Sequence, residues 1–142
     1  MFFGSFKHSI DDKGRLVLPA KFRFAFPDKI YLLKGSDGAI ELYNEKDFND
    51  YLSHLSSFPF EKKKGRDIIR VALASVIEIS VDSQGRILLP KEVLQKYGLK
   101  RDIMVVGVLS HIEIWDLEKW TEYFDKNEQD FEANLETFYA DR

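Results

Sequence analysis

The chain has 142 residues, of which 44% are apolar, 32% charged and 14% aromatic, so it can bury one substantial core or two small fused ones. Its net charge of −3 divides into alternating blocks: +4 over residues 1–34, −4 over 35–60, +4 over 61–110 and −7 over 111–142. The negative net charge does not exclude nucleic-acid binding, because phosphate attraction depends on the local field. A membrane-spanning helix is not expected, because no run approaches roughly 20 apolar residues.

The chain opens with a strand that arrives at Asp11, followed by a tight turn and a short strand over residues 16–18. Three residues separate Asp11 from Arg15, and Gly14 is the last of them, which is typical of a three-residue hairpin loop with glycine in the left-handed conformation. The carboxylate of Asp11 can accept hydrogen bonds from backbone amides further along the loop. Pro19 then stands where a first helical turn would begin, and we expect a helix over residues 20–26.

Two further strands, over residues 30–34 and 39–43, and a helix over residues 45–55 complete this unit. A basic linker, Glu61-Lys62-Lys63-Lys64-Gly65-Arg66, leads into a helical pattern that ends at Ser75. We therefore predict a basic linker helix over residues 60–75.

The same unit then occurs a second time. Residues 9–19 match residues 80–90 at a constant offset of 71, with six of eleven positions identical. After one inserted residue the match resumes at offset 72, where residues 40–43 match residues 112–115. We predict internal repeats over residues 5–48 and 76–119, with strands over 77–81, 87–89, 103–107 and 111–115 and helices over 91–97 and 117–124. Each copy has too little apolar surface to fold alone, so residues 1–142 should form a single α+β domain, a barrel-like core with a pseudo-two-fold axis.

The last segment, residues 125–142, is predicted to be a C-terminal helix. Phe131, Leu135 and Phe138 form an apolar stripe at helical spacing, and acidic residues occupy much of the remainder. The stripe could pack on the chain's own core or on a neighbouring subunit. The sequence leaves both alternatives open.

Convergent reactive groups are hard to find, so we expect no enzyme, no catalytic residues, no metal site and no cofactor. The sequence has no cysteine to act as nucleophile or thiolate ligand. His8, His54 and His111 lack the close spacing of metal ligands, and no nucleotide-binding glycine loop or nucleophile elbow occurs. No small-molecule substrate is therefore expected.

The duplicated Asp-x-x-Gly-Arg allows two interpretations that are compatible with each other. In the structural one, Asp11 pairs with Arg15, and Asp82 with Arg86, across each loop. In the functional one, the aspartate fixes a rigid tip from which Arg15 reaches a phosphate or a guanine edge. The first tip is the more basic, with Lys13, Lys21 and Arg23 close to it in the sequence, whereas the second has Gln84 and has Leu94 near the position equivalent to Arg23. The loop-forming residues are Asp11, Gly14, Asp82 and Gly85, and the candidate DNA-binding residues are Arg15, Arg86, Lys13, Lys21 and Arg23.

The doubled D-x-x-G-R-x-x-x-P, together with the opening Met1-Phe2-x-Gly4, resembles the MraZ family over residues 1 to about 125. The resemblance implies an AbrB-like, swapped-hairpin (double-split) barrel made from two tandem repeats and flanked by short helices. It also implies ring-shaped homo-oligomers that bind short repeated boxes of double-stranded promoter DNA upstream of the division and cell-wall gene cluster, as a transcriptional regulator that is often a repressor. The family's D-x-x-x-R signature maps onto Asp11 with Arg15 and onto Asp82 with Arg86; Gln84 departs from the basic residue of the family.

One subunit offers only two to four cations, so tight binding would require repeated contacts around a ring. We expect a cytoplasmic, nucleoid-associated protein. The alternative is an oligomeric scaffold or interaction protein without specific DNA binding, which salt-dependent binding to DNA would distinguish.

Overall fold

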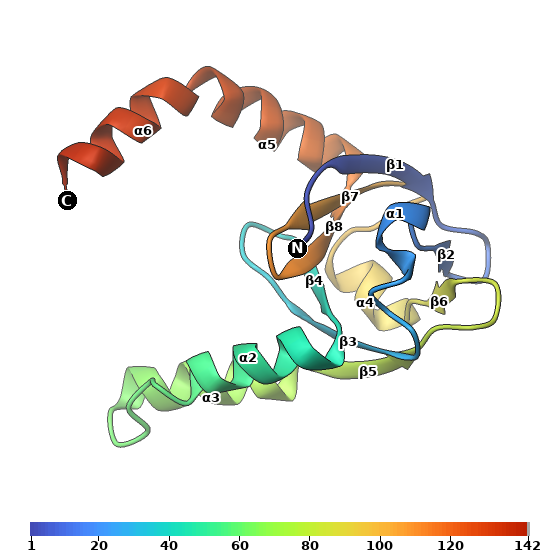
Figure 1. Cartoon of the computed structure of the whole chain (residues 1–142), viewed down its shortest axis with the longest axis horizontal. Helices are drawn as coiled ribbons and strands as arrows, with labels where there is room; N and C mark the ends of the chain where they lie inside the picture. The colour runs from blue at the N-terminus through green and yellow to red at the C-terminus, as the bar shows by residue number, and fades with distance from the viewer. Residues whose placement is uncertain (142) are drawn as a thin grey trace.

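Short antiparallel strands and short helices alternate in the same order in both halves of the chain (Figure 1). The structure is a computed structural model that describes residues 1–141. Its strands are β1 (Ser5–Ser9), β2 (Arg15–Val17), β3 (Lys29–Lys34), β4 (Ile40–Tyr43), β5 (Ile77–Ser80), β6 (Arg86–Leu88), β7 (Asp102–Val108) and β8 (His111–Asp116). Its helices are α1 (Ala20–Arg23), α2 (Glu45–Leu55), α3 (Lys63–Ala74), α4 (Lys91–Lys96), α5 (Leu117–Gln129) and α6 (Phe131–Ala140). The fold is therefore of the mixed α+β kind.

Strand pairing joins the two halves. Six strands form one antiparallel sheet in the order β1-β7-β8-β4-β3-β5, and β2 pairs with β6 in a separate two-stranded ribbon. In four of these pairings, β1 with β7, β3 with β5, β4 with β8 and β2 with β6, one strand comes from each half. Every strand of the first half therefore has a partner in the second half.

The expected barrel is not closed by a continuous hydrogen-bonded sheet. β1 and β5 remain the two edges of the six-stranded sheet. The reason lies in the loops that follow these two strands. Each loop turns the chain out of the sheet and into the β2–β6 ribbon, so β2 is joined to the β1 segment only through the isolated bridge between Ile10 and Leu16.

One hydrophobic cluster fills the space between the ribbon, the short helices and the sheet. The ribbon contributes Leu16 and Ile87, which are almost fully buried, and α1 contributes Phe22. The ring of Phe22 meets that of Phe2 edge-on, with 5.4 Å between the ring centroids. Because these residues come from both halves, the core requires both halves of the chain.

Aromatic side chains dock α2 and α5 on the sheet in the same way. Tyr43 of β4 contacts Tyr51 of α2, with ring centroids 5.2 Å apart, and Trp115 of β8 contacts Tyr123 of α5 at 4.8 Å. Both helices begin at a capping side chain, since Asn44 accepts from the amide of Asp47 at 2.8 Å and Asp116 from that of Lys119 at 3.3 Å.

The structure corrects three of the predicted helices. α1 ends at Arg23 instead of residue 26, because tight turns and then Pro27 follow it. The basic linker helix runs over Lys63–Ala74, not 60–75. The C-terminal segment is not one helix over 125–142, because α5 continues to Gln129 and α6 begins after Asp130. Arg142 lies outside the described residues.

Among residues 1–141, no helix combines the length and the apolar character that crossing a bilayer would require.

The interleaved strands predict that the first half cannot fold alone. In a fragment of residues 1–60, only the β3–β4 pairing of the sheet can form, and an isolated two-stranded hairpin is marginally stable at best. We expect its far-UV circular dichroism to be that of an unfolded chain with no cooperative thermal transition, while the full chain melts cooperatively. A cooperative transition in the fragment would show that one half has a sufficient core.

Candidate nucleic-acid interface

Asp11 organises the first Asp-x-x-Gly-Arg loop with both of its carboxylate oxygens. Its Oδ1 accepts from the backbone amides of Lys13 at 2.9 Å and Arg15 at 2.8 Å. Its Oδ2 accepts from Nε of Arg15 at 2.7 Å. The loop is thus held by its own aspartate, and the same bonds fix the direction in which the Arg15 side chain leaves the strand.

The second loop repeats this geometry. Oδ1 of Asp82 accepts from the amides of Gln84 at 2.8 Å and Arg86 at 2.9 Å, and Oδ2 accepts from Nε of Arg86 at 2.8 Å. The structural interpretation of the motif is therefore correct for both copies. It does not consume the arginines, because within residues 1–141 the Nη nitrogens of Arg15 and Arg86 donate no hydrogen bond.

These bonds also determine how the loops respond to pH. The bond from the Arg15 amide, helped by the Arg15 side chain, lowers the pKa of Asp11, and the amide of Arg86 likewise lowers the pKa of Asp82. A carboxyl whose pKa is lower in the folded state contributes folding stability at pH values above the ordinary pKa of 3.8. This stability is lost as the pH falls through the lowered pKa. Both loops should therefore stay ordered at neutral pH.

Each loop is completed by the other half of the chain. The carbonyl oxygen of Gly85 accepts from the amide of Leu18 at 3.0 Å, and that of Gly14 accepts from the amide of Leu89 at 2.9 Å. Both glycines have positive φ, +85° at Gly14 and +74° at Gly85. A Cβ at Gly14 would lie 2.9 Å from the carbonyl oxygen of Leu89, so this glycine serves both the turn and the close approach.

The β2–β6 ribbon brings the two arginines to one surface. Leu16 lies opposite Ile87, and both point into the core, so the pairs on either side, Arg15 with Leu88 and Val17 with Arg86, share the outer face. The side chains of Arg15 and Arg86 are 35% and 29% exposed. Val17 and Leu88 are also exposed, which is unusual for apolar residues on a strand with a buried face. We call these four residues the ribbon face.

The other predicted DNA-binding residues lie in different places. Lys13 is exposed at the first loop, as expected. Arg23 does not belong to the first tip: its Nη2 donates to the carbonyl oxygen of Ser83 at 3.3 Å, and a Cβ at Gly85 would overlap its side chain, so it lies against the second loop. Lys21 lies near the N-terminus, with Nζ 3.9 Å from the centroid of the Phe3 ring.

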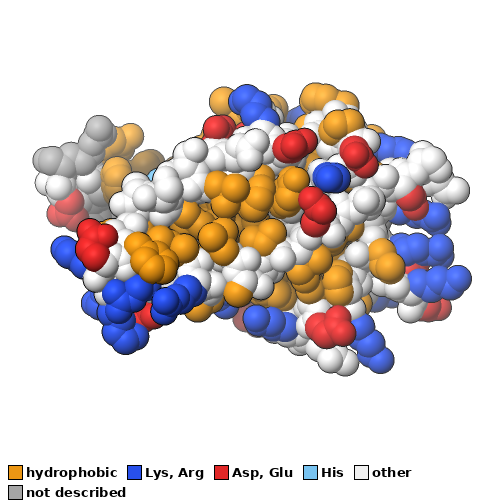
Figure 2. Space-filling model, turned by 90° about the horizontal axis from the view of Figure 1, so that it is seen from below, with side chains coloured by type: hydrophobic (Ala, Val, Ile, Leu, Met, Phe, Trp, Pro, Cys, Tyr) orange, Lys and Arg blue, Asp and Glu red, His pale blue; other side chains and the backbone are white. Residues whose placement is uncertain are grey.

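Arg23 lies at the second loop because the segment around each short helix packs on the loop of the other half. Leu94 of α4 lies against the first loop, where a Cβ at Gly14 would be 3.6 Å from Cδ1 of Leu94. In the same way, Arg23 of α1 lies against the second loop. The first loop thus has Lys13 and Arg15, whereas the second has Arg86 and Arg23. Figure 2 shows Lys and Arg side chains gathered at the end of the molecule where Figure 1 places these loops.

Sequence reasoning missed one cluster, because it treated His111 as an isolated histidine. The structure places His111 beside Glu113 and Glu41, whose ligand atoms all lie within 4.8 Å of one another. Glu41 and Glu113 occupy equivalent positions in the two repeats, and that signal, combined with pairing of β4 with β8, could have brought them together.

The chain matches the family model described as "MraZ protein, putative antitoxin-like" over residues 1–71 and 73–141. It is 38% identical over 123 residues to the "Transcriptional regulator MraZ" of Acetivibrio thermocellus, covering 87% of this chain and 86% of that protein. It is 39% identical over 132 residues to the protein of the same name from Limosilactobacillus fermentum, covering 93% and 92%.

Among solved structures, the chain is similar to the solution structure of PHS018 from Pyrococcus horikoshii, with a TM-score of 0.36 and 16% identity over 78% of this chain and 94% of that one. This similarity is too low to bear on fold or function.

The packing of Gly14 on the other half predicts a stability difference between two glycine variants. Gly38 also has positive φ, +87°, but a Cβ there meets nothing within 4 Å. Gly38→Ala should therefore lower the free energy of unfolding only by the roughly 1–2 kcal/mol that the left-handed conformation costs an alanine. Gly14→Ala should lose more, because its methyl group also crowds Leu89. Urea denaturation of both variants measures the difference, and equal losses would show that the loop does not press on the second half.

Proposed function

The chain belongs to the MraZ family of transcriptional regulators, and from that premise we propose that it binds promoter DNA in a sequence-specific manner through the ribbon face and its two flanking loops. Transcriptional regulation is not an enzyme class. As the family resemblance implies, its sites are short repeated boxes upstream of the division and cell-wall genes, where it acts as a repressor in the form of a ring-shaped oligomer. The observation that carries the proposal is the pair of aspartate-braced arginines on one exposed surface.

A two-stranded antiparallel ribbon fits the major groove of B-form DNA. Arg15 and Arg86 occupy diagonal positions on the two strands, where Cα atoms are typically about 7–8 Å apart, and each keeps Nη nitrogens for a guanine edge or a phosphate. Val17 and Leu88 lie between them and can contact thymine methyl groups. The bracing matters because a guanidinium held in direction loses less side-chain entropy when it binds.

We also infer that the two halves form the swapped-hairpin barrel that the family resemblance implies. The support is the interleaving: the ribbon uses one strand from each half, and each loop is closed by an amide of the other half. In that arrangement the ribbon and the six-stranded sheet enclose the core together, although no continuous ladder joins them.

The oligomer would be held by helices that project away from the ribbon. Phe131, Leu135 and Phe138 of α6 are exposed, which removes the alternative in which the stripe packs on the chain's own core. α3 is the complementary surface, because Ile68 and Val71 are exposed on it and residues 61–75 contain five Lys/Arg against two Asp/Glu. We propose that α6 of one subunit, in the acidic C-terminal block, packs on α3 of the next.

Such an assembly would supply what one subunit lacks. A single ribbon neutralises few phosphates, and each contributes only about −0.9 to the slope of log affinity against log salt. A ring that presents several ribbons to a series of boxes raises the effective concentration of each further contact, which can increase affinity by about a hundredfold or more.

Arg15→Ala should leave the fold intact and abolish specific promoter binding. A bidentate arginine–guanine contact contributes about 1–3 kcal/mol, so each lost contact lowers affinity roughly 5- to 150-fold, and a ring loses several. Gel-shift titrations with the protein's own upstream DNA measure this, with Lys46→Ala on α2, away from the ribbon, as the matched loss of one positive charge. Undiminished affinity of Arg15→Ala would contradict the ribbon-face model.

Arg86→Ala should weaken binding less than Arg15→Ala, because Gln84 replaces a basic residue in its loop. Arg23→Ala should weaken binding through the second loop, so its effect should be smaller in an Arg86→Ala background than alone. An Arg86→Ala loss as large as that of Arg15→Ala would overturn the ranking. If no variant changes binding and the wild type shows no salt-dependent affinity for DNA, the exposed apolar helices favour the oligomeric scaffold instead.

The double variant Phe131→Asp/Phe138→Asp should reduce the mass of the native particle. Two carboxylates in the apolar stripe of α6 would have to be desolvated against α3 of the neighbouring subunit. Native mass spectrometry gives the subunit number, with Phe24→Asp, at a residue 83% exposed on another surface, as the control. An unchanged mass in the double variant would exclude this interface.

A further inference from the structure

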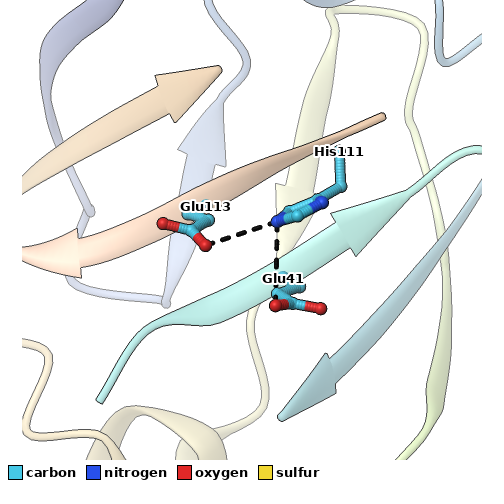
Figure 3. Close-up of side chains that lie close together, drawn as sticks. All are labelled: Glu41, His111 and Glu113. Atoms are coloured by element: carbon cyan, nitrogen blue, oxygen red, sulfur yellow. Dashed lines mark hydrogen bonds and ion pairs between the residues drawn. The ribbon is translucent and has the colours of Figure 1, made fainter. Parts of the chain in front are cut away.

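Three side chains of the types that ligate metals, Glu41, His111 and Glu113, converge where β4 and β8 meet (Figure 3). His111 and Glu113 lie two residues apart on β8, and Glu41 of β4 is directly opposite Glu113. Nε2 of His111 is 3.3 Å from Oε2 of Glu113 and 3.7 Å from Oε2 of Glu41. All three side chains are largely buried, with 13–17% of their surface exposed.

The two carboxylates are oriented by equivalent residues of the two repeats. The hydroxyl of Tyr43 donates to Oε1 of Glu41 at 3.0 Å, and Nε1 of Trp115 donates to Oε1 of Glu113 at 2.9 Å. Each carboxylate therefore uses one oxygen for an aromatic donor and turns the other toward His111. Outer donors that fix the orientation of ligating carboxylates in this way are typical of metal sites.

Two carboxylates directly opposite each other on neighbouring strands repel, and their burial adds a desolvation cost. Burial raises the pKa of Glu41; at Glu113 burial acts in the same direction, but hydrogen bonds from His111 and Trp115 outweigh it and lower the pKa. Within residues 1–141, no Lys or Arg forms a hydrogen bond or an ion pair with either carboxylate. A bound metal cation would relieve this repulsion and offset the cost of burying the two carboxylates.

The cluster can be reached from solvent. Glu41 lines an open hollow of about 490 Å³ between the sheet and α3, together with Gly35 and Asp67. Gly35 is adjacent to the carboxylate, since a Cβ there would lie 2.9 Å from Cγ and 3.2 Å from Oε2 of Glu41. The hollow therefore gives an ion a route from solvent to the carboxylate of Glu41.

We propose that Glu41, Glu113 and His111 bind a divalent first-row transition metal, with Zn²⁺ as the preferred ion. One imidazole nitrogen and two carboxylate oxygens form a donor set that Zn²⁺ accepts in tetrahedral geometry, with the fourth position left to water or to a group of a partner. The imidazole disfavours Mg²⁺ and Ca²⁺, which prefer oxygen ligands alone.

The test uses the full-length, untagged protein, titrated with ZnCl₂ in a calorimeter and with CoCl₂ while the visible absorption of tetrahedral Co²⁺ is recorded. We expect one ion per chain. His111→Ala should lower the Zn²⁺ affinity at least about 100-fold and abolish the Co²⁺ absorption, while His54→Ala, which removes an exposed histidine outside the cluster, should change neither. Absence of binding to the wild type would overturn the proposal.

Two further variants separate a ligand role from a structural one. Glu113→Gln keeps the shape of the side chain and both of its polar positions but removes the charged ligand. It should therefore lower the Zn²⁺ affinity as strongly as His111→Ala does, and it keeps the test valid if His111→Ala is less stable than the wild type. Tyr43→Phe removes only the hydroxyl that orients Glu41, and we expect a loss of about tenfold. Unchanged Zn²⁺ affinity in Glu113→Gln would place any bound ion elsewhere. DNA binding is measured separately, so either proposal can fail alone.

Discussion

The rest of the structure depends on the exchange of backbone hydrogen bonds between the two halves at their loops. Gly85 accepts from Leu18 and Gly14 accepts from Leu89, and the β2–β6 ribbon lies between these two bonds. Because the strands on either side of the ribbon also pair across the halves, the position of each loop depends on contacts with the other half. A rigid outer surface is therefore obtained from short loops that would be mobile on an isolated hairpin.

Local features of the site could be predicted from the sequence. Asp11, Gly14 and Arg15 form the three-residue loop that their spacing predicts, because the bonds involved join residues no more than four apart. Tyr43 and Trp115, which lie at matching positions of the two repeats, dock equivalent helices in the structure. Such signals survive in a sequence because turn geometry and helix docking depend on few, nearby residues.

What the sequence could not predict depends on contacts between distant segments. Arg23 looked like part of the first tip because it is near Arg15 along the chain, yet α1 packs against the loop of the other half. His111 looked isolated because its second glutamate comes from β4, through a strand register that no local pattern specifies. α1 ended early because the turns after Arg23 interrupted a helical pattern that was only one turn long.

The two loops are similar but not identical, and this inequality gives the ribbon a direction. Lys13 of the first loop corresponds to Gln84 of the second, and the side chain that packs on the first loop is Leu94, whereas Arg23 packs on the second. A dimer with true two-fold symmetry reads a palindrome, because both half-sites meet the same residues. If the ribbon face binds DNA as proposed, a single chain whose halves have diverged is released from that requirement: it would distinguish the two strands of a box and be suited to sites arranged head to tail.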